Sequence, residues 1–178
     1  MKYLVITDIH GGYKYLDLVL NKVKDFDKLI ILGDILYHGP RNNLPEEYDT
    51  KKVMEKLNNL RDKIIAIRGN CDAKIDLEVL DFPIYDSKFI KIDNRKFFLT
   101  HGDEFNKDHL PTKLLNYVML YGHFHKNELT EVNKKITTIN VGSLAIPKDG
   151  HYTYAIIENN KYTSYDLVSD ETILSYEF

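Results

Sequence analysis

The first third of the chain alternates between unbroken apolar runs and segments whose apolar residues recur every three or four positions. The unbroken runs predict buried strands over residues 2–7, 28–32 and 63–67. Helical spacing predicts a helix over residues 12–24. A second helix is expected from Pro45 to about Asp62, because the fixed φ of proline favours a helix start. Strand–helix–strand order predicts parallel pairing, with the helices packed on the sheet.

The second half of the chain has the pattern of strands joined in hairpins. Asp93-Asn94 and Asn159-Asn160 each separate two strand-like runs, and such dipeptides tolerate the positive φ of tight turns. The expected strands cover residues 87–93, 95–100, 117–121, 129–132, 136–141, 152–158 and 161–168. We found no repeat or linker, so residues 1–178 are expected to form a single α/β domain with two packed sheets.

Polar residues gather where five of the predicted strands end. The residues are Asp8, His10, Asp34, Asn70, His101, His123 and His125. Because ligands of open α/β sheets bind at the carboxyl ends of strands, we expect these side chains to converge on one site. One such residue alone is more often a helix cap or a turn residue, but the ordered set is hard to explain in that way.

The chemistry of these side chains indicates metal ions. Carboxylate and amide oxygens mixed with imidazole nitrogens suit Mn, Ni, Co, Zn or Fe better than Ca or Mg, which prefer shells of oxygen alone. The set is too large for one ion with open coordination positions, and it fits two ions that share a carboxylate. Two divalent transition-metal ions are therefore the expected cofactors, with Mn as the first choice.

Composition and charge exclude several classes of function. The chain has 24 basic and 27 acidic residues and a formal net charge of −3, so no broad nucleic-acid surface is expected. Cys71 is the only cysteine, which excludes a disulfide scaffold and fits a reducing, cytoplasmic location. The longest apolar runs fall far short of the ~20 residues of a membrane span, and we expect no signal peptide. The sequence also lacks a P-loop and a nucleophile elbow.

The motifs at the strand ends resemble those of the calcineurin-like metallophosphoesterases. The resemblance is carried by Asp8-x-His10, Gly33-Asp34, Gly69-Asn70, His101-Gly102, Gly122-His123-x-His125 and Asn140-Val141-Gly142-Ser143. Residues 33–42 and 68–72 are most similar to the small single-domain bacterial and archaeal phosphodiesterases of that family. The resemblance implies a four-layer α/β/β/α sandwich of two mixed sheets, with a site for two metals between the strand ends.

The same resemblance implies a role for each of the polar residues. It implies a first metal site of Asp8, His10, Asp34 and His125, and a second of Asp34, Asn70, His101 and His123, bridged by Asp34. Asn70 and His101 are also expected to be catalytic, beside a metal-bridging hydroxide that attacks phosphorus. The implied activity is hydrolysis of a small phosphodiester. The alternatives are a phosphomonoesterase of the same fold and a non-catalytic scaffold, the latter less expected because every implied ligand is present.

Three further residues have weaker predicted roles. Cys71, a third candidate catalytic residue, stands where many monoesterases of the family have a histidine that protonates the leaving group. A neutral thiol protonates a leaving group less well than a histidine, so Cys71 favours diesters or activated esters as substrates. The alternative is that Cys71 is a small packed residue without a catalytic role. Arg41 and His38 are the candidate substrate-binding residues, unless their loop merely caps the next helix. We expect no membrane partner, and self-association into a homo-oligomer is a further expectation.

Overall fold

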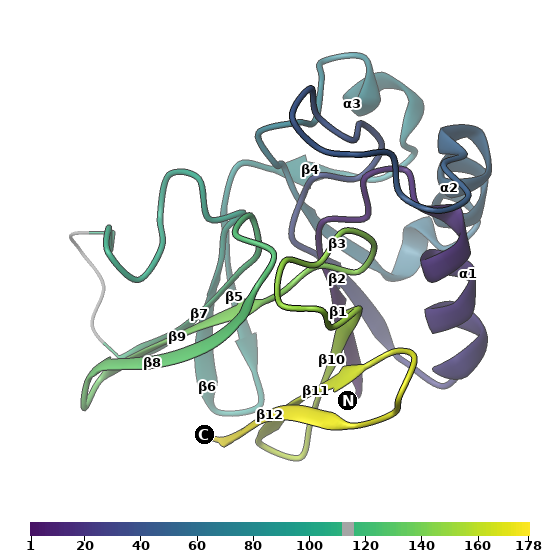
Figure 1. The fold of residues 1–178 in the computed structure, drawn as a ribbon. Coiled ribbons are helices and arrows are strands. Elements are labelled where there is room, and N and C mark those ends of the chain that lie inside the picture. The colour runs from purple at the N-terminus through teal and green to yellow at the C-terminus, as the bar shows by residue number, and fades with distance from the viewer. Residues whose placement is uncertain (112–115) are drawn as a thin grey trace.

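The computed structural model describes residues 1–111 and 116–178, and in these residues the strands form two mixed sheets (Figure 1). The first sheet contains β1 (Tyr3–Ile6), β2 (Lys28–Ile31), β3 (Ile64–Ile67), β4 (Ile84–Tyr85), β10 (Thr153–Glu158), β11 (Lys161–Asp166) and β12 (Thr172–Glu177). The second sheet contains β5 (Lys88–Ile92), β6 (Arg95–Leu99), β7 (Tyr117–Tyr121), β8 (Asn127–Asn133) and β9 (Ile136–Val141). The α-helices are α1 (Tyr13–Lys22), α2 (Thr50–Asn58) and α3 (Asp76–Val79).

The sequence predicts parallel pairing in the first third of the chain and antiparallel hairpins in the second half, and the observed strand pairing agrees with this division. The first sheet has the order β12-β11-β10-β1-β2-β3-β4, parallel from β1 to β4 and antiparallel from β1 to β12. The second has the order β5-β6-β7-β9-β8, with a parallel centre and an antiparallel strand at each edge. The predicted hairpins are confirmed, and Asn159 and Asn160 have φ of 53° and 59° in the turn between β10 and β11.

Alternate residues of the strands fill two separate cores. Leu4 and Ile6 of β1 pack in the core that contains α1 and α2, whereas Tyr3 and Val5 pack against the second sheet. Because both faces of the first sheet are covered, its parallel strands are unbroken apolar runs. Figure 1 shows α1 and α2 along one side of the molecule and the second sheet on the other. The predicted α/β architecture of two packed mixed sheets is confirmed.

The outer face of the second sheet is covered differently. Phe98, Tyr117 and Met119 are buried there, against Phe105 and Leu110 of the segment that follows β6. In the part of the chain that the structure describes, this outermost layer is therefore a loop rather than a helix.

The helix expected over Pro45–Asp62 is shorter at both ends, so its predicted bounds are wrong. The α2 helix begins only after Asp49, whose side chain caps its first turn. The preceding residues pair with the turn that follows β1: Asp49 N–H donates to the Gly11 carbonyl at 2.9 Å, and Tyr48 forms a β-bridge with Gly12. This pairing holds the backbone extended and prevents a helical start at the proline.

Several short elements were not expected from the pattern. The α3 helix has 4 residues and β4 has 2, too few to show a period. The β12 strand lies at the edge of the first sheet and is mostly half-exposed, so it lacks the apolar run of the inner strands. Within residues 1–111 and 116–178, no helix combines the length and the apolar character needed to cross a membrane.

Candidate metal centre

The loops that follow β1 and β2 lie side by side and are held by backbone hydrogen bonds. Asp8 N–H donates to the Gly33 carbonyl at 3.1 Å, and His10 N–H donates to the Asp34 carbonyl at 2.9 Å. From the segment after β9, the Ser143 hydroxyl donates to the Asp8 carbonyl at 3.0 Å. Three chain segments are thus fixed against one another at the carboxyl ends of the strands.

Backbone strain is concentrated in the predicted metal-binding residues. Positive φ occurs at Asp8 (52°), His10 (47°), Asp34 (54°), His123 (66°) and His125 (57°). Residues other than glycine rarely adopt this conformation, and each such residue costs ~1–3 kcal/mol. Strain of this kind persists only where the surroundings fix it, and it clusters at functional sites. The backbone therefore marks this edge of the two sheets as a site.

Asp8 turns one carboxylate oxygen toward the protein and the other toward the site. Its Oδ2 accepts hydrogen bonds from the Thr7 hydroxyl at 2.7 Å and the His123 N–H at 3.0 Å. Its Oδ1 is buried without a hydrogen-bond partner, and lies 3.1 Å from His125 Nε2 and 3.6 Å from His10 Nε2. His10 Nε2 is also buried and unpartnered.

Asp34 stands between two groups of donor atoms. Its Oδ1 accepts a hydrogen bond from the Cys71 N–H at 2.8 Å, which fixes the carboxylate plane. Its Oδ2 lies 3.5 Å from His10 Nε2 on one side and 3.4 Å from His101 Nε2 on the other. One oxygen atom is therefore shared by the two groups.

His101 is the centre of the second group. Its Nε2 lies 3.0 Å from Asn70 Oδ1 and 3.3 Å from His123 Nδ1, in addition to its approach to Asp34. These atoms come from the ends of β2, β3, β6 and β7, so both sheets contribute. The structure thus brings all seven predicted residues to one place.

Backbone carbonyls orient three of the four histidines of the cluster. The pairs are His10 with Tyr37, His101 with Leu32 and His125 with Ile146, at 2.8, 2.7 and 2.8 Å from Nδ1 to the oxygen. Because a carbonyl can only accept, each Nδ1 carries a proton, and Nε2 is the nitrogen that faces the site and is available as a ligand once it is deprotonated. A hydrogen bond of this kind is the usual support of a metal-binding histidine.

Proximity shifts the titration of the carboxylates and imidazoles. Burial raises the pKa of Asp8, but hydrogen bonds with His10 and His125 outweigh it and hold the pKa well below its ordinary value. Burial lowers the pKa of His101, yet Asp34 and then Asp8 act against it and raise the pKa to about 10. Any cation that binds here competes with protons for the imidazole nitrogens.

Among the residues that the structure describes, three sets of ligand atoms are each compact enough to hold an ion; one combines His10, Asp34 and Cys71, and the other two contain only carboxylates and imidazoles. The ligand atoms of Asp8, His10 and His125 lie within 4.8 Å of one another, and so do those of Asp8, Asp34 and His101. The unpartnered Asp8 Oδ1 and His10 Nε2 belong to the first of these two sets, and a divalent cation satisfies both lone pairs at once. The residues present therefore fit a pair of divalent ions.

Asp72 supports the site, and our sequence analysis did not single it out. Its buried carboxylate accepts hydrogen bonds from the backbone N–H groups of Asp34 at 2.9 Å, Ile35 at 2.7 Å and Gly69 at 2.7 Å. It thereby ties the loop after β2 to the loop after β3. A Cβ atom at Gly69 would overlap the Asp34 carboxylate, so only glycine permits this approach.

A cleft of about 870 Å³ opens beside the cluster. Arg41, Arg68 and Lys148 line it from three separate segments, so the cleft is cationic although the chain is acidic overall. Phe124, between two of the histidines, lines it with a side chain that is 44% exposed. Arg41 is where a substrate-binding residue was predicted, whereas the sequence analysis had assigned no role to Arg68, Lys148 or Phe124.

Of the other two residues with weaker predicted roles, Cys71 lines the cleft and His38 does not. Burial followed by the charge of Asp34 raises the pKa of Cys71 to about 12, so it is a neutral thiol. The ring of His38 instead packs edge-on against Tyr37 and Tyr48, with centroids 4.8 and 5.4 Å apart.

Comparison with known proteins identifies the class. The sequence profile of the calcineurin-like phosphoesterase superfamily domain matches residues 1–161. The chain therefore belongs to the calcineurin-like phosphoesterases, a family of phosphoric ester hydrolases that act with divalent metal ions. It is 38% identical to phosphodiesterase YfcE of Escherichia coli K12, over 98% of this chain and 96% of that protein.

Solved structures of relatives have the same fold. The structure of Yfce, a phosphoesterase from E. coli, superposes with a TM-score of 0.93 at 37% identity over 99% of each chain. A novel archaeal phosphodiesterase superposes with a TM-score of 0.63 at 22% identity over 100% of both chains. Vps29 of Entamoeba histolytica in complex with zinc superposes with a TM-score of 0.59 at 19% identity over 99% of each chain. The last two show the fold alone.

Proposed function

We propose that this chain hydrolyses small phosphodiesters at a centre of two divalent ions. The first ion would be held by Asp8, His10, Asp34 and His125, and the second by Asp34, Asn70, His101 and His123. The observation that carries the proposal is Asp34, whose Oδ2 lies 3.5 Å from His10 Nε2 and 3.4 Å from His101 Nε2, between the two sets of donors. The name of the relative YfcE supports a diester as the substrate.

The ions, when bound, supply Lewis acidity that neutralises phosphoryl oxygens and acidifies water for attack on phosphorus. The protein residues bind and orient the ester. Arg41, Arg68 and Lys148 attract the anion to the cleft, which offsets the net charge of −3. Asn70 can use its Oδ1 as a ligand while its Nδ2 remains a donor for a phosphoryl oxygen. The exposed ring of Phe124 removes water from one wall of the cleft.

The alternatives are less well supported. A phosphomonoesterase needs an acid for a poor leaving group, and the cleft offers at this position the neutral thiol of Cys71, with its pKa of about 12. A scaffold without activity does not need the strained backbone and oriented imidazoles of the cluster. We further propose Mn as the native metal, a cytoplasmic location and self-association into a homo-oligomer.

A screen of metals against substrates tests the proposed function. Protein treated with a chelator and dialysed is expected to be inactive, and Mn, Ni or Co is expected to restore hydrolysis of bis(p-nitrophenyl) phosphate. The monoester p-nitrophenyl phosphate and cyclic nucleotides serve as comparison substrates. No hydrolysis despite about two bound equivalents of metal would favour the scaffold, and a clear preference for monoesters would overturn the diesterase proposal.

Replacement of Cys71 tests the role of the leaving-group position. Cys71→His is expected to raise the rate on alkyl phosphate monoesters relative to diesters by about tenfold or more, because an imidazolium can protonate the departing alkoxide. The measurement is the ratio of kcat/KM for the two substrates. Cys71→Ala controls for packing and is expected to leave this ratio unchanged. An equal ratio in Cys71→His and the native chain would contradict the role of this position.

A further inference from the structure

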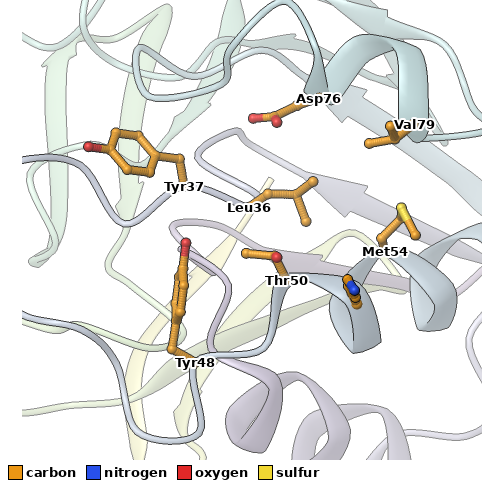
Figure 2. A pocket seen from close by; sticks show the side chains of 8 residues that line it. Leu36, Tyr37, Tyr48, Thr50, Met54, Asp76 and Val79 are labelled. Carbon is orange, nitrogen blue, oxygen red and sulfur yellow. The ribbon is translucent and has the colours of Figure 1, made fainter.

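A second cavity lies next to the cleft, and the proposed reaction does not use it. It has a volume of about 290 Å³ and is lined by Leu36, Tyr37, Tyr48, Thr50, Lys51, Met54, Asp76 and Val79. Figure 2 shows Tyr48 and Asp76 reaching toward the same space from opposite sides, with Leu36 between them. Its volume lies at the lower end for ligand sites, which suits one arm of a ligand rather than a whole molecule.

Asp76 is the anionic group of this cavity. Its side chain is 8% exposed, and its Oδ2 accepts one hydrogen bond, from the Ala73 N–H at 3.0 Å. Among the described residues, Oδ1 has no hydrogen-bond donor and the carboxylate has no cation within ion-pair distance. Oδ1 does not belong to the fully buried unpartnered atoms, so it remains accessible from the cavity, where it can meet the positive group of a ligand.

The two tyrosines provide aromatic walls that are held in place. The ring of Tyr48 packs directly on Gly11, where a Cβ atom would collide with it. His38 lies between the tyrosines and contacts both rings edge-on, which explains a residue that sequence analysis had placed at the substrate. Aromatic faces beside a carboxylate attract organic cations, above all alkylammonium groups.

Tyr37 connects this cavity to the catalytic cleft. Its side chain is 41% exposed and lines both spaces, and its carbonyl accepts the Nδ1–H of His10 at 2.8 Å. An arm that leaves the phosphorus on this side therefore passes over Tyr37 into the cavity. Arg41, Arg68 and Lys148 line the cleft and not this cavity, whose own cation, Lys51, has an exposed side chain. Asp76 is therefore the buried charged group of the cavity lining, and its negative charge suits a positive group of the ligand.

We propose that this cavity binds the cationic arm of the substrate, and that the preferred substrates are phosphodiesters with an alkylammonium group on one arm. Asp76 balances the positive charge, and Tyr37 and Tyr48 contact the methylene or methyl groups around it. This inference rests on the proposed diesterase function, whose substrate class it narrows.

Two diesters that differ in one atom test the proposal. In p-nitrophenyl phosphorylcholine one arm ends in trimethylammonium, and in p-nitrophenyl neohexyl phosphate a neutral carbon replaces that nitrogen. Leaving group and shape are the same, so the ratio of kcat/KM isolates the charge. With the metal-loaded native protein, the cationic diester is expected to be favoured by about tenfold or more.

Substitutions of cavity residues test whether the preference for the cationic diester arises in the cavity. Asp76→Asn keeps an acceptor for the Ala73 N–H and is expected to reduce the preference to about twofold or less, and Tyr37→Leu is expected to reduce it several-fold. Because the ratio is taken within one variant, a loss of folded protein does not alter it. Asp81→Asn removes the same charge from an exposed position and is expected to keep the native preference.

The possible results separate this inference from the proposed function. Hydrolysis of bis(p-nitrophenyl) phosphate without preference for the cationic arm would overturn the inference alone. A preference that survives in Asp76→Asn would also overturn it, because the cation would then be recognised elsewhere. If no diester is hydrolysed by the metal-loaded protein, the proposed function itself fails.

Discussion

Asp34→Ala is expected to lower kcat/KM for bis(p-nitrophenyl) phosphate by about a thousandfold or more. Asp34 Oδ2 is the one oxygen placed between the two donor groups, so its removal leaves each group a ligand short and the two without a shared atom. The loss is expected to exceed the ~10–100-fold effect of groups that merely support metal ligands. Steady-state kinetics in saturating Mn²⁺ measures it.

The metal content of the Asp34 variants shows whether a loss of activity comes from loss of an ion or from a changed position of a bound ion. Asp34→Ala is expected to retain less than two equivalents of metal by elemental analysis, whereas Asp34→Asn, similar in shape but uncharged, is expected to be intermediate. Asp86→Ala removes an exposed carboxylate and is expected to behave like the native protein. Near-native activity in Asp34→Ala would exclude the shared-carboxylate arrangement.

Asp72→Ala is expected to destabilise the protein by about 3–5 kcal/mol, the largest effect on stability that we anticipate at this site. The substitution leaves the buried N–H groups of Asp34, Ile35 and Gly69 without their acceptor. Urea unfolding followed by circular dichroism measures the free energy of unfolding. Activity is expected to fall as well, because Asp72 fixes the backbone on both sides of Asp34 and Asn70.

Asp49→Ala provides the comparison for Asp72. Its carboxylate also accepts a backbone N–H, that of Lys52 at 3.0 Å, but it does so at the exposed start of α2. Loss of such a cap is expected to cost about 1 kcal/mol and to leave activity unchanged. If the two variants had equal free energies of unfolding, the argument from buried N–H groups at Asp72 would be wrong.

The candidate site could be predicted largely from the sequence. The seven residues from Asp8 to His125 follow strands whose apolar runs are evident, and carboxyl ends of parallel strands share one edge of a sheet. Strand assignment therefore predicts that the residues of each sheet share an edge, and packing of the two sheets brings the two edges together. The role of these residues as ligands stays a prediction. The supports of the site were not predictable: Asp72 bonds across the chain to Asp34, and His101 to the carbonyl of Leu32, 69 residues away.

The helix predicted to begin at Pro45 shows that a long-range contact can override the conformational preference of a single residue. Proline favours a helix start on its own φ, but the pairing of Tyr48 with Gly12 holds that segment extended. The same pairing places the ring of Tyr48 in the second cavity, opposite Asp76. A pattern of neighbouring residues contains no information on this contact, because it forms only once the turn after β1 and the segment before α2 have met.

The sequence by itself determined the strands, the hairpin turns, the mixed oxygen and nitrogen donor set and the family. These depend on neighbouring residues, through periodic burial, the φ tolerance of residues such as Asn159, and motif spacing. The tertiary structure alone decided which oxygen of Asp34 is shared, which nitrogen of each histidine faces the site, and that Asp76 lines one cavity together with two tyrosines. Those features are distances between atoms far apart in the chain, and packing of the two sheets fixes them.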